Sequence, residues 1–169
     1  MSHLNYSQCL ISLLTLKIGG NGVYKIFLPL AESITVSIIY LLVKHFEHIY
    51  FVKQSAGSPG SSEIYMIAIN KLHHLDNEEY LLYCFENFNN NLALFPKEIY
   101  DEYYLLQMHR ISKDFVDKQI ETLNRSIFYY DWPKMYKEHE KYIEKAKEQY
   151  AKNWIYENKF IKLEKKLML

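Results

Sequence analysis

The chain has 169 residues, of which 49% are apolar and 24% charged. This balance is typical of a globular protein with a real core, and it excludes a disordered or collagen-like chain. The 20 basic and 20 acidic side chains cancel, so the net charge alone does not indicate a nucleic-acid partner.

The cysteines and the hydropathy of the chain indicate in which cellular compartment the protein is expected. Cys9 and Cys84 lie far apart in sequence and lack metal-type spacing, which favours free thiols in a reducing environment. The longest apolar run, 34–43, is well short of the ~18 residues expected of a membrane span. The N-terminus shows neither the basic region nor the cleavage site of a signal peptide. We therefore expect a cytoplasmic protein without membrane attachment.

Helix and strand patterns alternate over the first 71 residues. Gly19-Gly20 ends the first helical pattern, Pro29 ends the first strand, and a loop rich in Gly, Ser and Pro precedes the third strand. The sequence predicts helices over 2–18 and 31–46, and strands over 22–28, 48–53 and 63–71. This alternation is typical of an α/β layered sheet.

The second half of the chain has helical patterns only, predicted over 77–88, 97–128 and 134–166. Trp132-Pro133 separates the last two, because the residue before a proline disfavours the helical basin. A lysine stripe on the last helix is interpreted as a solvated face in preference to a phosphate-binding face: Lys134, Lys137, Lys141 and Lys145. The aromatic residues of this helix are expected to make core or docking contacts: Tyr136, Tyr150, Trp154 and Tyr156.

Two predicted strands each contain one charged residue. Lys25 lies within Val23–Phe27, and Glu63 opens the strand that continues with Ile64-Tyr65. A charge inside an apolar strand is costly unless a partner or a task holds it there. The two residues are therefore the first candidates for a functional pair.

The surrounding pattern resembles the C-terminal half of FtsJ-like ribose 2′-O-methyltransferases, most closely those of large DNA viruses. The matching order begins with a helix, a Gly-Gly turn, a strand with lysine and a second helix. It continues with a strand ending near lysine, a Ser-rich loop, and a strand opening with Ser-x-Glu-hydrophobic-Tyr, here Ser61-Ser62-Glu63-Ile64-Tyr65. Gln54 departs from the proline of many relatives. The resemblance covers roughly residues 1–71 and implies a partial Rossmann-like sheet of about three strands with flanking helices, followed by a helical C-terminal extension.

The resemblance also implies roles for individual residues. By position, Lys25 matches the second lysine and Glu63 the glutamate of the family's Lys-Asp-Lys-Glu set, which acts on a ribose 2′-hydroxyl with S-adenosylmethionine as methyl donor. The lysine would deprotonate or orient the hydroxyl, and the glutamate would position the lysine. Lys53, Ser55 and Ser58 could face the RNA backbone at the strand ends.

A cofactor cradle is missing from this pattern. Gly20-Asn21-Gly22 precedes a strand, whereas a phosphate- or adenosyl-binding Gly-rich turn follows one and opens a helix. We therefore expect a fragment or subunit that is inactive alone and uses S-adenosylmethionine only when a front half is supplied. The predicted division is a methyltransferase part at 1–75 and a helical extension packing on it at 76–169.

Two functions remain open at this stage. The first is the C-terminal portion of an RNA 2′-O-methyltransferase that modifies mRNA caps or rRNA, acting in a host cytoplasm or virion. The second is a non-catalytic remnant that serves as an interaction or structural subunit. Without the front half, strand 22–28 would have an unpaired edge, which predicts self-association or a protein partner along residues 23–28.

The histidines give no clear metal signal. His45 and His48 lie three apart, and His73 and His74 are adjacent, but no third and fourth ligand stands at suitable spacing. His45 is expected at a helix C-terminus, where a protonated histidine is favourable.

Overall fold

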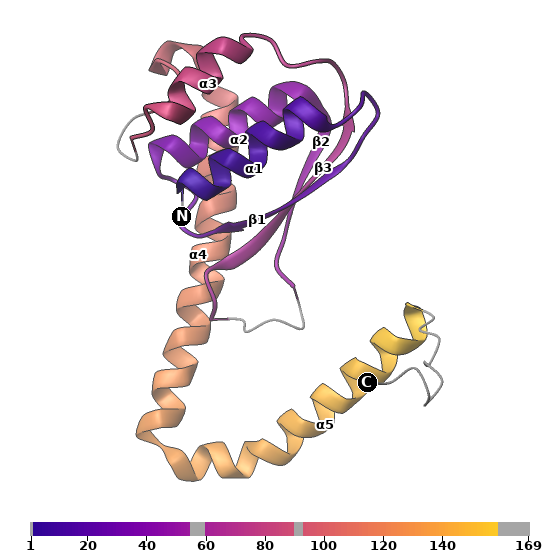
Figure 1. Cartoon of the computed structure of the whole chain (residues 1–169). Helices are drawn as coiled ribbons and strands as arrows, with labels where there is room; N and C mark the ends of the chain where they lie inside the picture. Colours follow the sequence, from indigo (N-terminus) through magenta and orange to yellow (C-terminus); the bar gives the residue numbers. More distant parts are fainter. Residues whose placement is uncertain (1, 55–59, 90–92, 159–169) are drawn as a thin grey trace. The chain divides into compact units, whose positions relative to one another are not determined.

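The computed structural model describes residues 2–54, 60–89 and 93–158 (Figure 1). Two compact units are present, Met1–Leu123 and Asn124–Leu169. The boundary between these two units, at residues 123 and 124, differs from the boundary predicted between residues 75 and 76. The predicted boundary at residue 75 marks where the resemblance to methyltransferases ends, which compactness does not test, so it stays a prediction.

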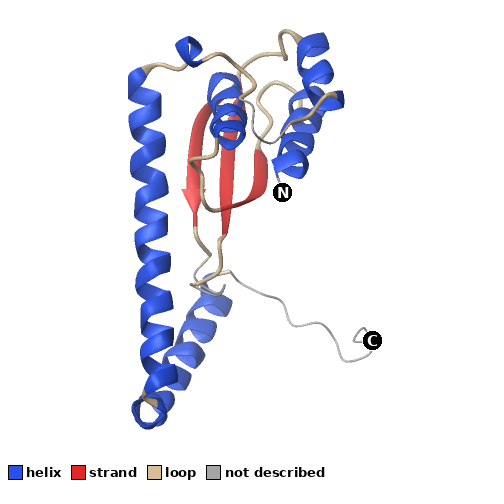
Figure 2. Cartoon of the chain, turned by 90° about the vertical axis from the view of Figure 1, so that its left-hand side faces the viewer, coloured by secondary structure: helices blue, strands red, loops and turns tan. Residues whose placement is uncertain are grey.

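Three strands form one antiparallel sheet in the order β1-β3-β2 (Figure 2). Strand β1 (Gly22–Phe27) and strand β2 (Phe46–Val52) both pair with the central strand β3 (Glu63–Lys71). The connection from β1 to β2 runs through helix α2 (Ser33–His45), so β3 returns between two parallel strands. Among the described residues β1 pairs on one edge only, as the sequence predicts.

One face of the sheet is buried beneath helix α1 (Ser2–Thr15) and helix α2. Alternation along the strands places Tyr24 and Ile26 of β1 and Ile64, Met66 and Ala68 of β3 in the core. Helix α2 is apolar on several sides and buries nine of its residues, as expected for a helix enclosed by neighbours. The core thus fixes which strand positions face solvent.

The remaining helices of the first unit close one end of this core. Leu81 of α3 (Glu78–Glu86) is buried, and Tyr6 of α1 donates a hydrogen bond to its carbonyl at 2.7 Å. Helix α4 (Glu102–Asp131) contributes Tyr104, whose hydroxyl donates to the Val36 carbonyl at 2.6 Å. Residues beyond 75 therefore complete the same core as the sheet.

The α/β class with a helical C-terminal part is confirmed, with corrections at the element ends. Helix α1 ends three residues early, since the chain turns at Gly19, whose φ is +81°. Strand β2 begins two residues early, directly after α2. The helix predicted at 97–128 is divided into a short 3-10 turn (Lys97–Ile99) and α4, with Asp101 Oδ1 accepting from the Tyr104 amide at 2.7 Å as an N-terminal cap.

Helix α5 (Pro133–Glu157) lies in the second unit and buries none of its residues. Its aromatics are therefore not core residues, since the exposed fraction is 40% for Tyr136 and 85% for Tyr156, and docking contacts stay a prediction. Its helical periodicity is real, but its apolar side chains stay uncovered among the described residues. Along the described parts of the chain, no helix has the length and apolar character needed to cross a bilayer.

Candidate active site

Lys25 and Glu63 lie together on the solvent-facing side of the sheet. Lys25 is opposite Tyr65 in the register and Glu63 is opposite Phe27, so the two charged residues are diagonal neighbours on adjacent strands. The Lys25 Nζ and Glu63 Oε2 atoms are 2.6 Å apart. The strand period therefore carries both side chains to one face, while Tyr24, Ile26 and Ile64 point into the core.

The pair is accessible to solvent, which corrects the expectation of a charge buried in an apolar strand. The Lys25 side chain is 48% exposed and that of Glu63 is 29% exposed. Solvation removes most of the cost that the sequence suggested. An accessible ammonium and carboxylate are, in turn, positioned to contact a large polar ligand.

Tyr65 is a third member of this cluster, and sequence reasoning did not assign it a role. Its hydroxyl donates to Glu63 Oε1 at 2.5 Å, so both carboxylate oxygens are engaged. Hydrogen bonds from Lys25 and then Tyr65 lower the pKa of the Glu63 carboxyl, because they favour its charged form. The Glu-x-Tyr spacing on one strand is the signal that could have indicated this contact.

The ion pair with Glu63 also determines the protonation state of Lys25. The hydrogen bond with Glu63 raises the pKa of the Lys25 ammonium above its ordinary value. The ammonium of Lys25 also lies 5.6 Å from the centre of the Phe27 ring, which further favours the cation. In this arrangement Lys25 donates hydrogen bonds and becomes a base only if other groups lower its pKa.

The three predicted RNA-contacting residues have different outcomes. The Lys53 ammonium donates to the backbone carbonyls of Ser61 and Glu63, the latter at 2.9 Å, and so holds the start of β3. It also contributes to the lowered pKa of Glu63. Ser55 and Ser58 lie outside the described residues, and RNA contact by all three stays a prediction.

The Gly20-Asn21-Gly22 segment is a structural turn. The Gly20 amide donates to the Lys17 carbonyl at 2.9 Å, and Asn21 Oδ1 accepts from the Asn70 amide at 2.8 Å. A side chain at Gly22 would meet the Tyr24 hydroxyl at 2.6 Å. These residues are occupied by their own chain and do not fit a cradle for S-adenosylmethionine.

Comparison with known proteins identifies relatives along most of the chain, although no family model matches. An uncharacterized protein, L511, of Acanthamoeba polyphaga mimivirus is 29% identical over 171 residues, which span 99% of this chain and 21% of that protein. The probable methyltransferase EP424R of African swine fever virus is 29% identical over 173 residues, spanning 96% of this chain and 39% of that protein. The chain is a distant relative of viral methyltransferases.

A mammalian protein extends this relationship. The cap-specific mRNA (nucleoside-2′-O-)-methyltransferase 2 of Mus musculus is 28% identical over 130 residues, which span 75% of this chain and 17% of that protein. The resemblance to 2′-O-methyltransferases that the sequence indicates is thus confirmed as a distant relationship. The chain spans less than two fifths of the length of each of these three relatives.

His45 lies at the other end of the sheet, in the last turn of α2, as the sequence predicts. The residue is 5% exposed, and its Nδ1 lies 2.7 Å from the Leu41 carbonyl. Burial lowers the pKa of its imidazole, since the charged form loses hydration. The ring centres of His45 and His73 are 4.8 Å apart, but the described residues hold no group of three or more side chains arranged to bind a metal ion.

Acid should destabilise the fold through His45. Its folded pKa lies below the ordinary value of 6.5, so the unfolded chain takes up the proton first as the pH falls. The corresponding stability is present above about pH 6.5 and is lost as the pH falls through the folded pKa. Urea unfolding should show this loss, and NMR titration of the His45 ring should give a pKa below 6.5. A His45 ring that titrates at or above the ordinary pKa of histidine would contradict the prediction.

Proposed function

We propose that this chain forms the Lys25–Glu63 part of an S-adenosylmethionine-dependent RNA ribose 2′-O-methyltransferase, of the type that modifies mRNA caps or rRNA. The observation that carries the proposal is the ion pair of 2.6 Å on an accessible sheet face, between the two residues that match the family set. The relative named for cap-specific 2′-O-methylation supports RNA as the substrate class.

The chemistry assigned to this chain is positioning and proton handling at one sugar oxygen. The Lys25 ammonium would donate to the ribose 2′-oxygen, while Glu63 fixes its direction and Tyr65 fixes Glu63. For Lys25 to accept the hydroxyl proton, its pKa has to fall, which a bound RNA that excludes water and a further nearby cation would bring about. Because Gly20-Asn21-Gly22 does not fit a cofactor cradle, the methyl donor would be held by other residues of the enzyme.

A second function remains in view because β1 has a free edge among the described residues. Val23 on this strand is 67% exposed. An open edge with exposed apolar side chains favours pairing with another strand. The chain would then be a non-catalytic interaction subunit, associating along residues 23–28 with itself or with a partner chain.

The function is tested with the full protein or complex that contains this chain together with a cofactor-binding half. Capped RNA and rRNA transcripts are incubated with methyl-labelled S-adenosylmethionine, and nuclease digestion locates the label. We expect label on the ribose 2′-oxygen and none on RNA with 2′-deoxyribose at that nucleotide. Label on a base, or transfer to the 2′-deoxy RNA, would contradict the proposal.

A further inference from the structure

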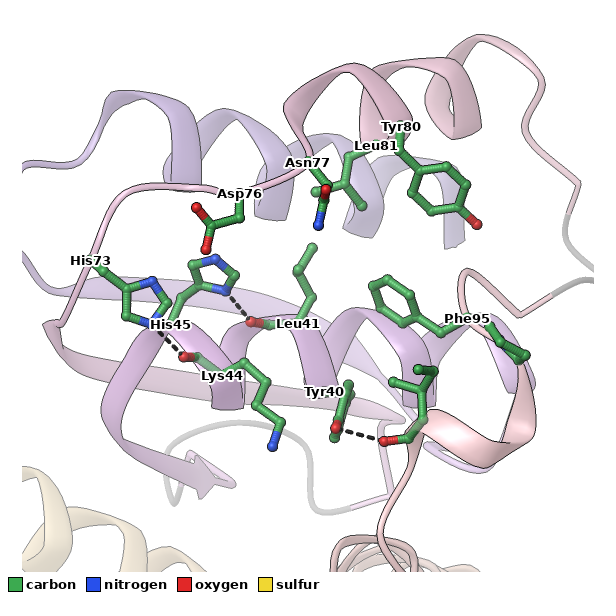
Figure 3. A pocket seen from close by; sticks show the side chains of 12 residues that line it. Tyr40, Leu41, Lys44, His45, His73, Asp76, Asn77, Tyr80, Leu81 and Phe95 are labelled. Carbon is green, nitrogen blue, oxygen red and sulfur yellow. Dashed lines mark hydrogen bonds between the residues drawn. The ribbon is translucent and has the colours of Figure 1, made fainter.

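A groove of about 520 Å³ lies between strand β2 and the start of helix α4, in the first unit. Its walls are residues 46–51 of β2, residues of the segment 101–111, and Ile39 and Val43 of α2. Strand β2 ends the order β1-β3-β2, so its outer edge pairs with no other strand in the described part of the chain. The groove shares no residue with the pocket shown in Figure 3, and neither Lys25 nor Glu63 lines it.

The hydrogen-bond pattern of the sheet decides which backbone groups of β2 face the open edge. The Leu28 amide donates to the Ser62 carbonyl at 2.9 Å, so these two residues continue the β1–β3 ladder as a hydrogen-bonded pair. Because such pairs alternate in an antiparallel ladder, Ile67 of β3 turns its backbone toward β2, where it pairs with Tyr50. The N–H and C=O groups of the next residue, Ile49, therefore point to the open edge.

The side chains beside this edge are mostly apolar. Ile49 and Phe51 pair with buried residues of β3, so their side chains lie on the core side of the sheet. On the opposite wall, Met108 is buried and Ile111 is partly buried against the same core. Tyr103, which is 72% exposed, adds an aromatic ring from α4. A strand added at this edge would place every second side chain against apolar walls.

The charged groups of the groove are mainly acidic. Glu47 is the second residue of β2 and Asp101 directly precedes α4, and both carboxylates are exposed. Among the described residues that line the groove there is one histidine, His48, but no lysine or arginine. The wall charge therefore complements a basic side chain on the ligand.

We propose that this groove docks an extended segment of a partner protein, which adds to β2 as a further strand. The segment alternates apolar and polar side chains and carries a lysine or arginine where it passes Glu47. Its backbone bonds the open groups of Ile49, while the apolar walls and the carboxylate select its side chains. A second copy of β2 is less suited, because its Lys53 ammonium already donates to backbone carbonyls at the start of β3.

The experiment measures peptide binding to the full chain by calorimetry, without methyl transfer, so its outcome is independent of the proposed function. The probe is a peptide as long as β2 that alternates valine and threonine and has lysine at one end. A second peptide has the lysine at the other end. We expect saturable binding of both, about threefold tighter for the peptide whose lysine reaches Glu47.

Methylation of the peptide nitrogens tests the added strand directly. Only alternate amides of an added strand face β2. N-methylation of one alternate set should therefore weaken binding by about tenfold or more, and N-methylation of the other set should not. Equal effects of the two sets would show apolar adhesion without strand pairing and would overturn the proposal.

Variants of the chain locate the peptide. Ile49→Pro removes the outward N–H at a position where an edge strand tolerates proline, and it should weaken binding by about tenfold or more, with circular dichroism confirming the fold. Glu47→Lys should weaken binding of the tighter peptide by about tenfold through charge repulsion. Glu121→Lys, exposed on α4 outside the groove, is the matched control and should bind as the unchanged chain does.

Three other results would overturn the proposal. The first is no saturable binding at millimolar concentration, or unchanged affinity in Ile49→Pro. The second is loss of binding in Val23→Pro in place of Ile49→Pro, which would put the peptide at the free edge of β1. The third is self-association in sedimentation that Ile49→Pro abolishes, without peptide binding, which would assign the β2 edge to a second copy of the chain.

Discussion

Replacing Lys25 by alanine should reduce methyl transfer by a factor of about 10² to 10⁴ in the enzyme that contains this chain. The reason is that the Lys25 ammonium is the donor held at the accessible face by Glu63, at 2.6 Å. Because the side chain is 48% exposed and paired at the surface, its removal should leave the fold intact. Rates of label incorporation into RNA, with circular dichroism of each variant, check both statements.

A second surface ion pair provides a control for the loss of a charge without loss of a proposed catalytic group. Lys113 pairs with Asp117 at exposed positions on α4 and matches no residue of the family set, so Lys113→Ala should keep the full rate. If Lys25→Ala keeps it as well, the catalytic assignment fails and the interaction-subunit reading gains support.

The pH dependence of the rate gives an independent readout of Glu63. Glu63 raises the pKa of Lys25, so Glu63→Gln should lower that pKa. If Lys25 acts as the base, the rising limb of the pH–rate profile should move to lower pH in Glu63→Gln and disappear in Lys25→Ala. A profile unchanged by Glu63→Gln would show that the carboxylate does not set the protonation of the lysine.

Replacing Lys71 by methionine should cost about 3 kcal/mol in the free energy of unfolding. Lys71 is 1% exposed, and its ammonium donates to the carbonyls of Leu13 and Leu16, the latter at 2.8 Å. These carbonyls end helix α1, where backbone acceptors lack partners and the helix dipole favours a cation. Methionine keeps the aliphatic stem but leaves the buried acceptors unsatisfied.

Urea unfolding followed by far-ultraviolet circular dichroism measures this loss. Lys17→Met changes an exposed lysine just beyond α1 and should remain within about 0.5 kcal/mol of the unchanged chain. Hydrogen exchange of the α1 amides should be faster in Lys71→Met, since the helix end loses its cap. A loss below about 1 kcal/mol would mean that water replaces the ammonium.

The sequence located the strands and their spacing because local patterns dictate them. Alternation of apolar residues and the Gly19 turn depend on neighbours in the chain, so β1 and β3 were predicted within one residue. The matching of Lys25 and Glu63 to a known motif also needed only residue order. Their distance of 2.6 Å, and the hydrogen bond from the Tyr65 hydroxyl to the second carboxylate oxygen, depended on the register between β1 and β3, which are distant in sequence.

The sequence by itself determined the α/β class, the helical second half and the relationship to methyltransferases, because these depend only on the order and spacing of nearby residues. Only the tertiary structure decided which side chains are buried. Lys71 and His45 look like ordinary strand-end and helix-end residues, yet they are enclosed because α1 and the segment after β3 close over them. Burial depends on contacts between distant segments, and no local pattern encodes them.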